Sequence, residues 1–173
     1  MRKIILGFAV SLDGYIEGPK GEIDWCLMDQ DYGMKDFLKG VDTLFMGRKT
    51  YELTQTMPGG AGFPRLKKYV FSRSLKYAPE GMILINGDLK NEVDKIRNTK
   101  GKDIWLFGGA DLFTSLMNTM QVDEIWMMVH PVLLGGGKPL FRNIPGRANL
   151  KLLDSRTYST GLVSVKYEVI KQV

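Results

Sequence analysis

Short apolar segments alternate with amphipathic ones along most of the chain. Compact apolar runs are typical of buried strands, and apolar residues spaced three or four apart are typical of helices. Strands are predicted at residues 3–10, 43–46, 68–71, 82–85, 104–107 and 124–130. Helices are predicted at residues 29–39, 50–56, 89–99 and 110–120. Because strands and helices alternate, the pattern predicts βαβ units around a mainly parallel sheet.

The C-terminal part of the chain has a different pattern. Two apolar segments, 150–158 and 162–170, are separated only by residues 159–161. This connection is too short to hold a crossover helix, so the two strands are predicted to form an antiparallel hairpin. We therefore expect one α/β domain over residues 1–173, with a mixed, mostly parallel sheet and a C-terminal antiparallel hairpin.

Two local features refine this picture between the second and third predicted strands. Thr50 can cap the helix predicted at 50–56, because a threonine hydroxyl can accept a hydrogen bond from a free amide of the first turn. The segment 58–64 is rich in glycine and proline and is predicted to be a loop.

The composition limits the kinds of site the chain can hold. Cys26 is the only cysteine and His130 the only histidine, which excludes an internal disulfide, a cysteine-cluster zinc site and a histidine-rich metal site. No metal is therefore expected. The first apolar stretch is short and contains Gly7, so it is interpreted as a buried strand and not as a signal peptide. No apolar run reaches the roughly 18 residues of a membrane helix, and we expect a cytoplasmic protein without a membrane partner.

The net charge of +5 is compatible with several anionic partners. Lysine and arginine are spread along the chain and do not form one basic run, which argues against nucleic acid. Nucleic-acid binding stays open as an alternative, and strongly salt-dependent binding to DNA or RNA would reveal it. The phosphates of a small molecule would use the same positive charge.

Three segments at the ends of predicted strands could bind phosphate. Gly47-Arg48-Lys49-Thr50 combines a helix start with two cations, and free amides at a helix N-terminus attract anions. The same segment is also compatible with an ordinary capped helix whose two cations are exposed to solvent.

The second and third segments follow later strands. Ser72-Arg73-Ser74 offers two hydroxyls and a guanidinium, which suit a ribose phosphate, although an ordinary polar strand exit has the same composition. Gly108-Gly109-Ala110-Asp111 would allow the backbone to approach a pyrophosphate closely. It is also compatible with a tight strand-to-helix turn, and it differs from the G-x-G-x-x-G fingerprint of Rossmann folds.

A fourth segment, residues 130–141, contains three consecutive glycines after His130. A lone histidine at a strand end is more often a structural hydrogen-bonding group than a catalytic one, although its charge can switch near neutral pH.

The order and spacing of these segments resemble the dihydrofolate reductase-like superfamily. Within it, the chain resembles most closely the C-terminal reductase domain of the bifunctional riboflavin-biosynthesis deaminase–reductase, as a stand-alone domain. The segments 10–16 (Val-Ser-Leu-Asp-Gly-Tyr-Ile) and 132–141 (Val-Leu-Leu-Gly-Gly-Gly-Lys-Pro-Leu-Phe) favour this branch. The resemblance covers essentially the whole chain and implies a three-layer α/β/α fold.

The resemblance implies NADPH as the cofactor. The positions that match the family's cofactor-binding segments are Ala9, Gly47, Arg48, Lys49, Thr50, Ser72, Arg73, Ser74, Gly108, Gly109, Ala110 and Asp111. It also implies a cleft for the hydride acceptor between the first strand and the first helix, near Asp13, Trp25 and Asp31. Asp31 is the expected proton relay, and Asp13 is the second candidate. A homodimer is implied because relatives pair through the sheet edge and the late strands.

Two departures concern the substrate. Ile23-Asp24-Trp25-Cys26 replaces the Met-Pro-Trp-type loop of dihydrofolate reductases and has no proline. The deaminase half of the riboflavin enzyme has no counterpart. We therefore expect NADPH-dependent reduction of a C=N or C=O bond in a small heterocyclic or sugar-like molecule. The alternative is a non-catalytic NADPH-binding or sensing protein on the same fold.

Overall fold

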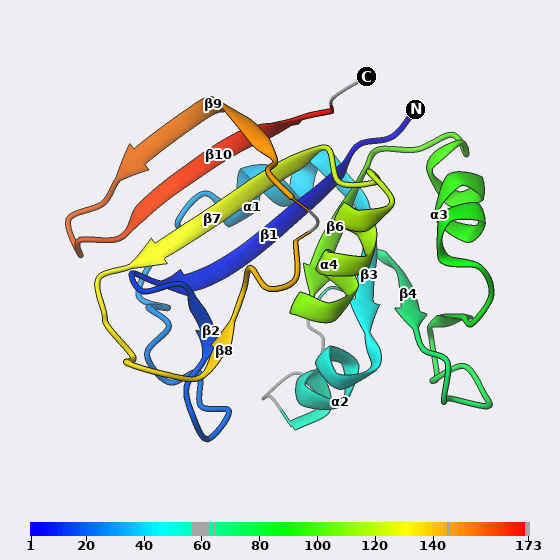
Figure 1. The fold of residues 1–173 in the computed structure, drawn as a ribbon, viewed down its shortest axis with the longest axis horizontal. Coiled ribbons are helices and arrows are strands. Elements are labelled where there is room, and N and C mark those ends of the chain that lie inside the picture. Colours follow the sequence, from blue (N-terminus) through cyan, green and yellow to red (C-terminus); the bar gives the residue numbers. More distant parts are fainter. Residues whose placement is uncertain (57–62, 64, 145, 172–173) are drawn as a thin grey trace.

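The computed structural model describes residues 1–56, 63, 65–144 and 146–171. Among these residues, eight strands form one sheet in the order β5-β4-β3-β6-β1-β7-β10-β9 (Figure 1). In that spatial order the strands are β5 (Ile83–Ile85), β4 (Lys67–Phe71), β3 (Val41–Gly47), β6 (Asp103–Gly108), β1 (Ile4–Ser11), β7 (Glu124–His130), β10 (Val163–Ile170) and β9 (Asn149–Thr157).

The sheet is mixed, as the sequence predicts. The six strands from β5 to β7 are parallel to one another. β10 is antiparallel to both β7 and β9. The C-terminal hairpin is therefore confirmed. The predicted loop at 58–64 lies outside the described residues except for Phe63.

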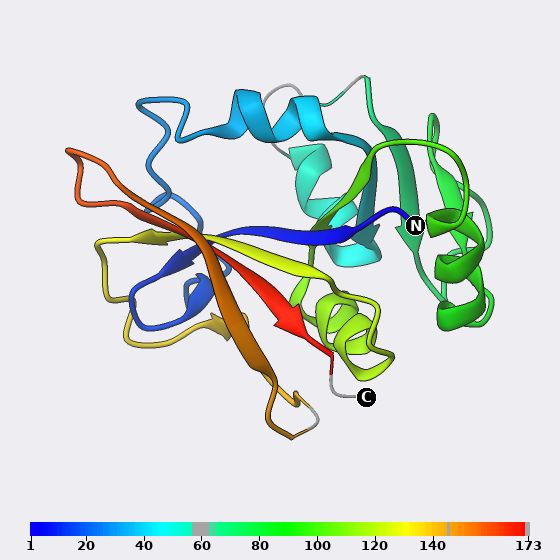
Figure 2. The same cartoon turned by 90° about the horizontal axis from the view of Figure 1, so that it is seen from above.

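Helices cover both faces of the sheet. They are α1 (Met34–Gly40), α2 (Arg48–Thr56), α3 (Leu89–Arg97) and α4 (Ala110–Asn118). Figure 2, which views the sheet nearly edge-on, shows α1 and α4 on opposite sides of it. This arrangement gives the three layers that the family resemblance implies.

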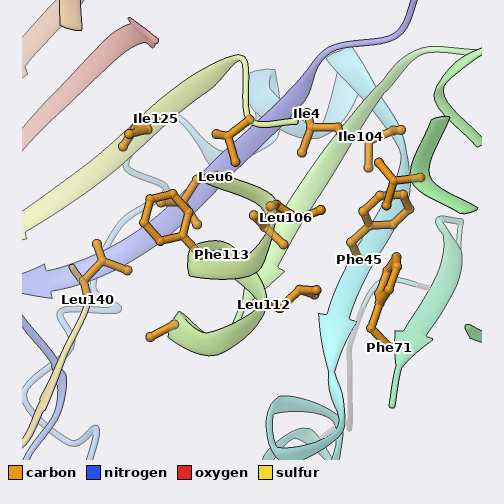
Figure 3. Close-up of a cluster of buried hydrophobic side chains, with 14 of the residues drawn as sticks. Ile4, Leu6, Phe45, Phe71, Ile104, Leu106, Leu112, Phe113, Ile125 and Leu140 are labelled. Carbon is orange, nitrogen blue, oxygen red and sulfur yellow. The ribbon is translucent and has the colours of Figure 1, made fainter. Parts of the chain in front are cut away.

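Side chains of the central strands alternate between two apolar clusters, because successive residues of a strand point to opposite faces. Ile104 and Leu106 of β6 pack in the cluster that contains Phe113 of α4, whereas Trp105 packs in the cluster that receives Phe37 of α1. Figure 3 shows Phe113 pointing toward Leu6 in the first cluster. These paired faces pack β3, β6 and β1 into the core, and β3 and β6 carry part of the candidate site at their carboxyl ends.

A second, two-stranded sheet was not predicted. It pairs β2 (Tyr15–Glu17) with β8 (Lys138–Pro139), and Figure 1 shows both strands beside each other near the carboxyl end of β1. Strands of two or three residues are too short to show a period of two, and their pairing joins positions more than 100 residues apart. Lys138, which directly follows the three consecutive glycines, therefore lies in a strand.

Two helix starts differ from the prediction. The helix predicted from residue 29 begins at Met34, because Tyr32 and Gly33 have φ values of 50° and 86° and interrupt the helical backbone. The helix that Thr50 was predicted to cap begins two residues earlier, at Arg48, so Thr50 lies inside its first turn. The cap prediction is wrong because the backbone becomes helical directly after Gly47.

The described helices are all too short or too polar to cross a membrane.

Candidate functional site

A cavity of about 680 Å³ opens at the carboxyl edge of the parallel strands. Its walls are the starts of α2, α3 and α4 and the segment that follows β4. Because β5, β4, β3 and β6 are neighbours and parallel, their carboxyl ends meet at this edge, where ligands of open α/β sheets bind. The residues lining it are Gly47, Arg48, Lys49, Thr50, Phe71, Ser72, Arg73, Ser74, Ile85, Asn86, Gly87, Asp88, Leu89, Gly109, Asp111, Leu112, Ser115 and Lys138.

The electrostatics of the cavity favour an anion. The N-termini of α2, α3 and α4 all reach it, and each carries unpaired amides and a positive helix-dipole end. Four cationic side chains line the walls against two carboxylates. One of these carboxylates, Asp88, accepts a hydrogen bond from the Asn91 amide at 2.8 Å as the cap of α3. The other, Asp111, pairs with Arg142.

The first segment predicted to bind phosphate lies on the cavity wall built by α2. Arg48 Nη1 donates to Glu52 Oε1 at 2.7 Å, four residues along the helix. Such partly exposed pairs are worth less than about 1 kcal/mol, so the guanidinium can exchange Glu52 for a phosphate at little cost. Lys49 is exposed beside it.

The second segment follows β4 and forms a hydroxyl-capped turn. Ser72 Oγ accepts hydrogen bonds from the amides of Ser74, at 3.2 Å, and Leu75, at 3.1 Å. This turn fixes the backbone on either side of Arg73, whose exposed side chain belongs to the cavity wall. A guanidinium and adjacent hydroxyls are suitable donors for a phosphate monoester.

The glycine turn after β6 brings bare backbone to the cavity. A Cβ atom at Gly109 would lie 3.1 Å from Thr50 Oγ1 and 3.7 Å from Lys138 Nζ. A side chain there would therefore fill the space between α2 and Lys138. At Gly108 a Cβ would overlap the Phe8 ring, with a closest approach of 2.4 Å. Glycine at both positions leaves a cradle that fits a pyrophosphate, which is the part of a dinucleotide that helix N-termini bind.

The structure brings most of the predicted cofactor-binding residues together. Nine of the twelve line the cavity, whereas Ala9, Gly108 and Ala110 do not. Ala110 and Gly108 are buried behind the glycine turn, and Ala9 lies within β1, paired with Met128. Sequence reasoning missed Lys138 and the start of α3. Asn86-Gly87-Asp88 is a strand-to-helix turn of the kind used to find the other segments, and it could have been included.

The predicted acceptor-side residues have separate partners. Asp13 accepts hydrogen bonds from Ser11 Oγ at 2.6 Å, and from the amides of Leu134, at 3.1 Å, and Gly135, at 2.8 Å. The Ser11 hydrogen bond, supported by the two amides, lowers the pKa of Asp13 below its usual range. This carboxylate therefore fastens the glycine-rich loop to the end of β1.

Asp31 and Trp25 lie in the segment that leads to α1. The Asp31 carboxylate is exposed and accepts from the Lys35 amide at 3.1 Å, so it satisfies a free donor in the first turn of α1. Trp25 Nε1 donates to the Glu22 carbonyl at 3.2 Å, and its ring meets the His130 ring edge-on at 5.3 Å between centroids. Asp13 and Asp31 are both exposed to solvent, and they differ in the number of donors that their carboxylates already accept from.

The fold and the cavity define a class: a dihydrofolate reductase-like α/β protein with a cavity rich in cationic side chains at the carboxyl edge of its sheet. The model of the RibD C-terminal domain family matches residues 2–164. The chain therefore belongs to this family of riboflavin-type reductase domains. The uncharacterized protein YyaP of Bacillus subtilis (strain 168) is 45% identical to it over 177 residues, covering 96% of this chain and 94% of YyaP.

Solved structures agree with this assignment. A protein from Shewanella sp. PV-4 assigned to riboflavin biosynthesis superposes with a TM-score of 0.84 at 25% identity, covering 98% of this chain and 99% of the other. Dihydrofolate reductase from Enterococcus faecalis, solved with NADP(H), superposes with a TM-score of 0.68 at 20% identity, covering 96% of this chain and 94% of the reductase. The latter likeness shows the fold alone, and the predicted fold class is confirmed.

Proposed function

We propose that the protein is an NADPH-dependent reductase of a small heterocyclic or sugar-like molecule. One observation carries the proposal: three helix N-termini and four cationic side chains converge on a single cavity of about 680 Å³. This size is within the usual range for a ligand site, and the donors suit a ligand with several phosphates. Family membership and the fold shared with a dinucleotide-binding reductase support the same conclusion.

Different residues of the cavity would bind different parts of the cofactor. Arg48 and Arg73 would hold the 2′-phosphate of the adenosine ribose, because a guanidinium forms paired hydrogen bonds with phosphate oxygens. The bare backbone at Gly109 and the hydroxyl of Thr50 would face the pyrophosphate. When bound, the cofactor supplies the hydride, and the chain positions it and excludes water.

A proton must also reach the reduced molecule, and Asp31 is the better candidate to relay it. Its carboxylate is exposed and has one amide partner, whereas three donors occupy the carboxylate of Asp13. Asp13 stays the second candidate. Trp25 lies between these two aspartates in the sequence, and its ring contacts the ring of His130. It would provide a flat apolar wall for a heterocycle.

Titration of the protein with NADPH and NADH, followed by nucleotide fluorescence, tests the cofactor. We expect NADPH to bind more tightly than NADH. The double variant Arg48→Ala with Arg73→Ala should weaken NADPH binding by about 30-fold or more, since hydrogen bonds to charged groups contribute about 1.5–3 kcal/mol each. Arg147→Ala with Arg156→Ala removes two guanidinium groups outside the cavity and is the matched control. Binding of neither nucleotide at high micromolar concentration would exclude the proposal.

The second candidate is a non-catalytic NADPH-binding or sensing protein. It is favoured by the structural hydrogen bonds that both Asp13 and Asp31 make. Oxidation of bound NADPH in the presence of pteridines, pyrimidines or quinones separates the two. Turnover with any of them supports the reductase, and tight binding without turnover across the panel supports the sensor.

We also propose that the protein is a homodimer that pairs through β9. This edge strand is exposed along its whole length and carries Leu150, Leu152 and Leu153, which are 41–52% exposed. Unpaired amides and carbonyls of an edge strand, together with apolar side chains, are suited to pairing with a second chain.

A further inference from the structure

Lys138 lies in the wall of the phosphate cavity but comes from a different part of the fold than the other cations. Arg48, Lys49 and Arg73 follow strands of the main sheet, whereas Lys138 belongs to β8 of the second sheet. Its side chain is only 22% exposed. Lys138 therefore reaches the cavity from the glycine-rich segment that follows β7, and most of its side chain is buried.

The ammonium of Lys138 is fixed against the glycine turn. Its Nζ atom lies 3.7 Å from the position that a Cβ atom would take at Gly109. Glu17 Oε1, in the paired strand β2, accepts a hydrogen bond from it at 3.2 Å. Among the described residues this is the one hydrogen bond of an ammonium that has three donors. The remaining donors are available to a ligand in the cavity.

The location selects which phosphate Lys138 can reach. Gly109 follows β6 and Ser72 follows β4, with β3 between them, so the two strand exits are separated by about 10 Å at the usual strand spacing. Lys138 adjoins the first exit, where the bare backbone forms the cradle. Arg73 belongs to the second. A dinucleotide that spans both exits would have its pyrophosphate near Lys138 and its 2′-phosphate near Arg73.

We propose that Lys138 is a further cofactor-binding residue that contacts the pyrophosphate, and that Glu17 is a positioning residue that holds its ammonium at the glycine turn. This inference rests on the proposed function and identifies how the second sheet contributes to the same site. The pairing of β2 with β8 would thereby connect the acceptor-side segment after β1 to the phosphate cavity.

Nucleotides that differ in their phosphates test this assignment. Lys138→Met keeps most of the length of the side chain and removes the charge. We expect it to weaken the binding of NADPH and of NADH by the same factor, about tenfold or more. Adenosine 2′-monophosphate, which lacks the pyrophosphate, should compete for the site equally well in Lys138→Met and in the wild type. Arg73→Ala should give the opposite pattern, with a loss for NADPH and for adenosine 2′-monophosphate but not for NADH.

Controls separate a lost contact from a lost fold. Lys138→Arg should retain most of the affinity, and Lys20→Met, an exposed lysine outside the cavity wall, should behave as the wild type. Lys138→Gln keeps a polar partner for Glu17 and replaces Lys138→Met if the latter melts early. Unchanged NADPH affinity in a folded Lys138 variant overturns the inference, as does an equal loss for adenosine 2′-monophosphate.

The positioning role of Glu17 has its own test. Glu17→Ala should weaken NADPH binding about threefold in the wild-type background and should have no effect on it in Lys138→Met, because the two residues act through one contact. Equal effects in both backgrounds would contradict the positioning role of Glu17. If the wild type binds neither NADPH nor NADH, the proposed function fails; if the wild type binds and the Lys138 variants bind equally well, only the inference fails.

Discussion

At the residue scale, burial decides the chemistry of the two side chains that composition singles out. His130 is 2% exposed, and this burial lowers its pKa because it disfavours the charged imidazolium. Cys26 is partly buried, which raises the pKa of its thiol to about 11. At neutral pH the fold therefore contains a neutral imidazole and a protonated thiol, and the protonated thiol is not prepared to act as a nucleophile.

The lowered pKa of His130 predicts a pH dependence of stability. The unfolded chain, with a pKa near 6.5, takes up the proton before the folded one does. Because the unfolded state then binds more protons, stability should fall as the pH drops below 6.5 and should level off below the folded pKa. Thermal melts across this range should show the decline in the wild type. Since His130 is the only histidine, His130→Gln should remove this decline in stability. The same dependence of the melting temperature on pH in both proteins would contradict the prediction.

At the element scale, the second sheet depends on one glycine. Gly137 has a φ of 127°, and a Cβ atom there would lie 2.0 Å from the carbonyl oxygen of Glu17. No side chain can fit between the two strands at this distance. The sequence showed three consecutive glycines without showing which of them the fold requires, because the close approach involves a strand 120 residues away in the chain.

Substituting neighbouring glycines tests this requirement. Gly137→Ala should lower the free energy of unfolding by about 1–3 kcal/mol, through backbone strain and displacement of β2. It should also weaken NADPH, because Lys138 is the next residue. Gly136→Ala, where the nearest atom is Pro19 Cγ at 3.6 Å, is the matched control and should be close to neutral. Denaturant unfolding of both variants, with NADPH titration, measures the difference; equal destabilisation would falsify the account.

At the scale of the whole molecule, β9 forms one of the two edges of the main sheet, and it is the edge through which we propose that the protein pairs. Sedimentation should give a species of about twice 19.5 kDa for the proposed homodimer. Leu152→Lys with Leu153→Lys places charges on β9 and should yield the monomer, since an edge that carries lysine resists pairing. Leu12→Lys, which changes an apolar residue that is 65% exposed elsewhere, should leave the dimer intact. A wild-type protein that sediments only as a monomer would show the proposed pairing to be wrong.

The sequence by itself determined the features that depend on local spacing. Short apolar runs and period-3.6 patterns located the main strands and helices within a few residues, apart from the late start of α1 at Met34. Glycine, cations and hydroxyls directly after strands identified half of the residues that line the cavity, because the carboxyl end of a strand is visible in the sequence itself.

Only the tertiary structure decided which of these segments meet. The strand order places the exits of β5, β4, β3 and β6 side by side, and no local pattern specifies that order. Pairing of β2 with β8 brings Lys138 to the glycine turn at Gly109 across the fold. The physical reason is that backbone propensity and hydrophobic period act over a few residues, whereas strand pairing and burial join residues that are far apart in the chain.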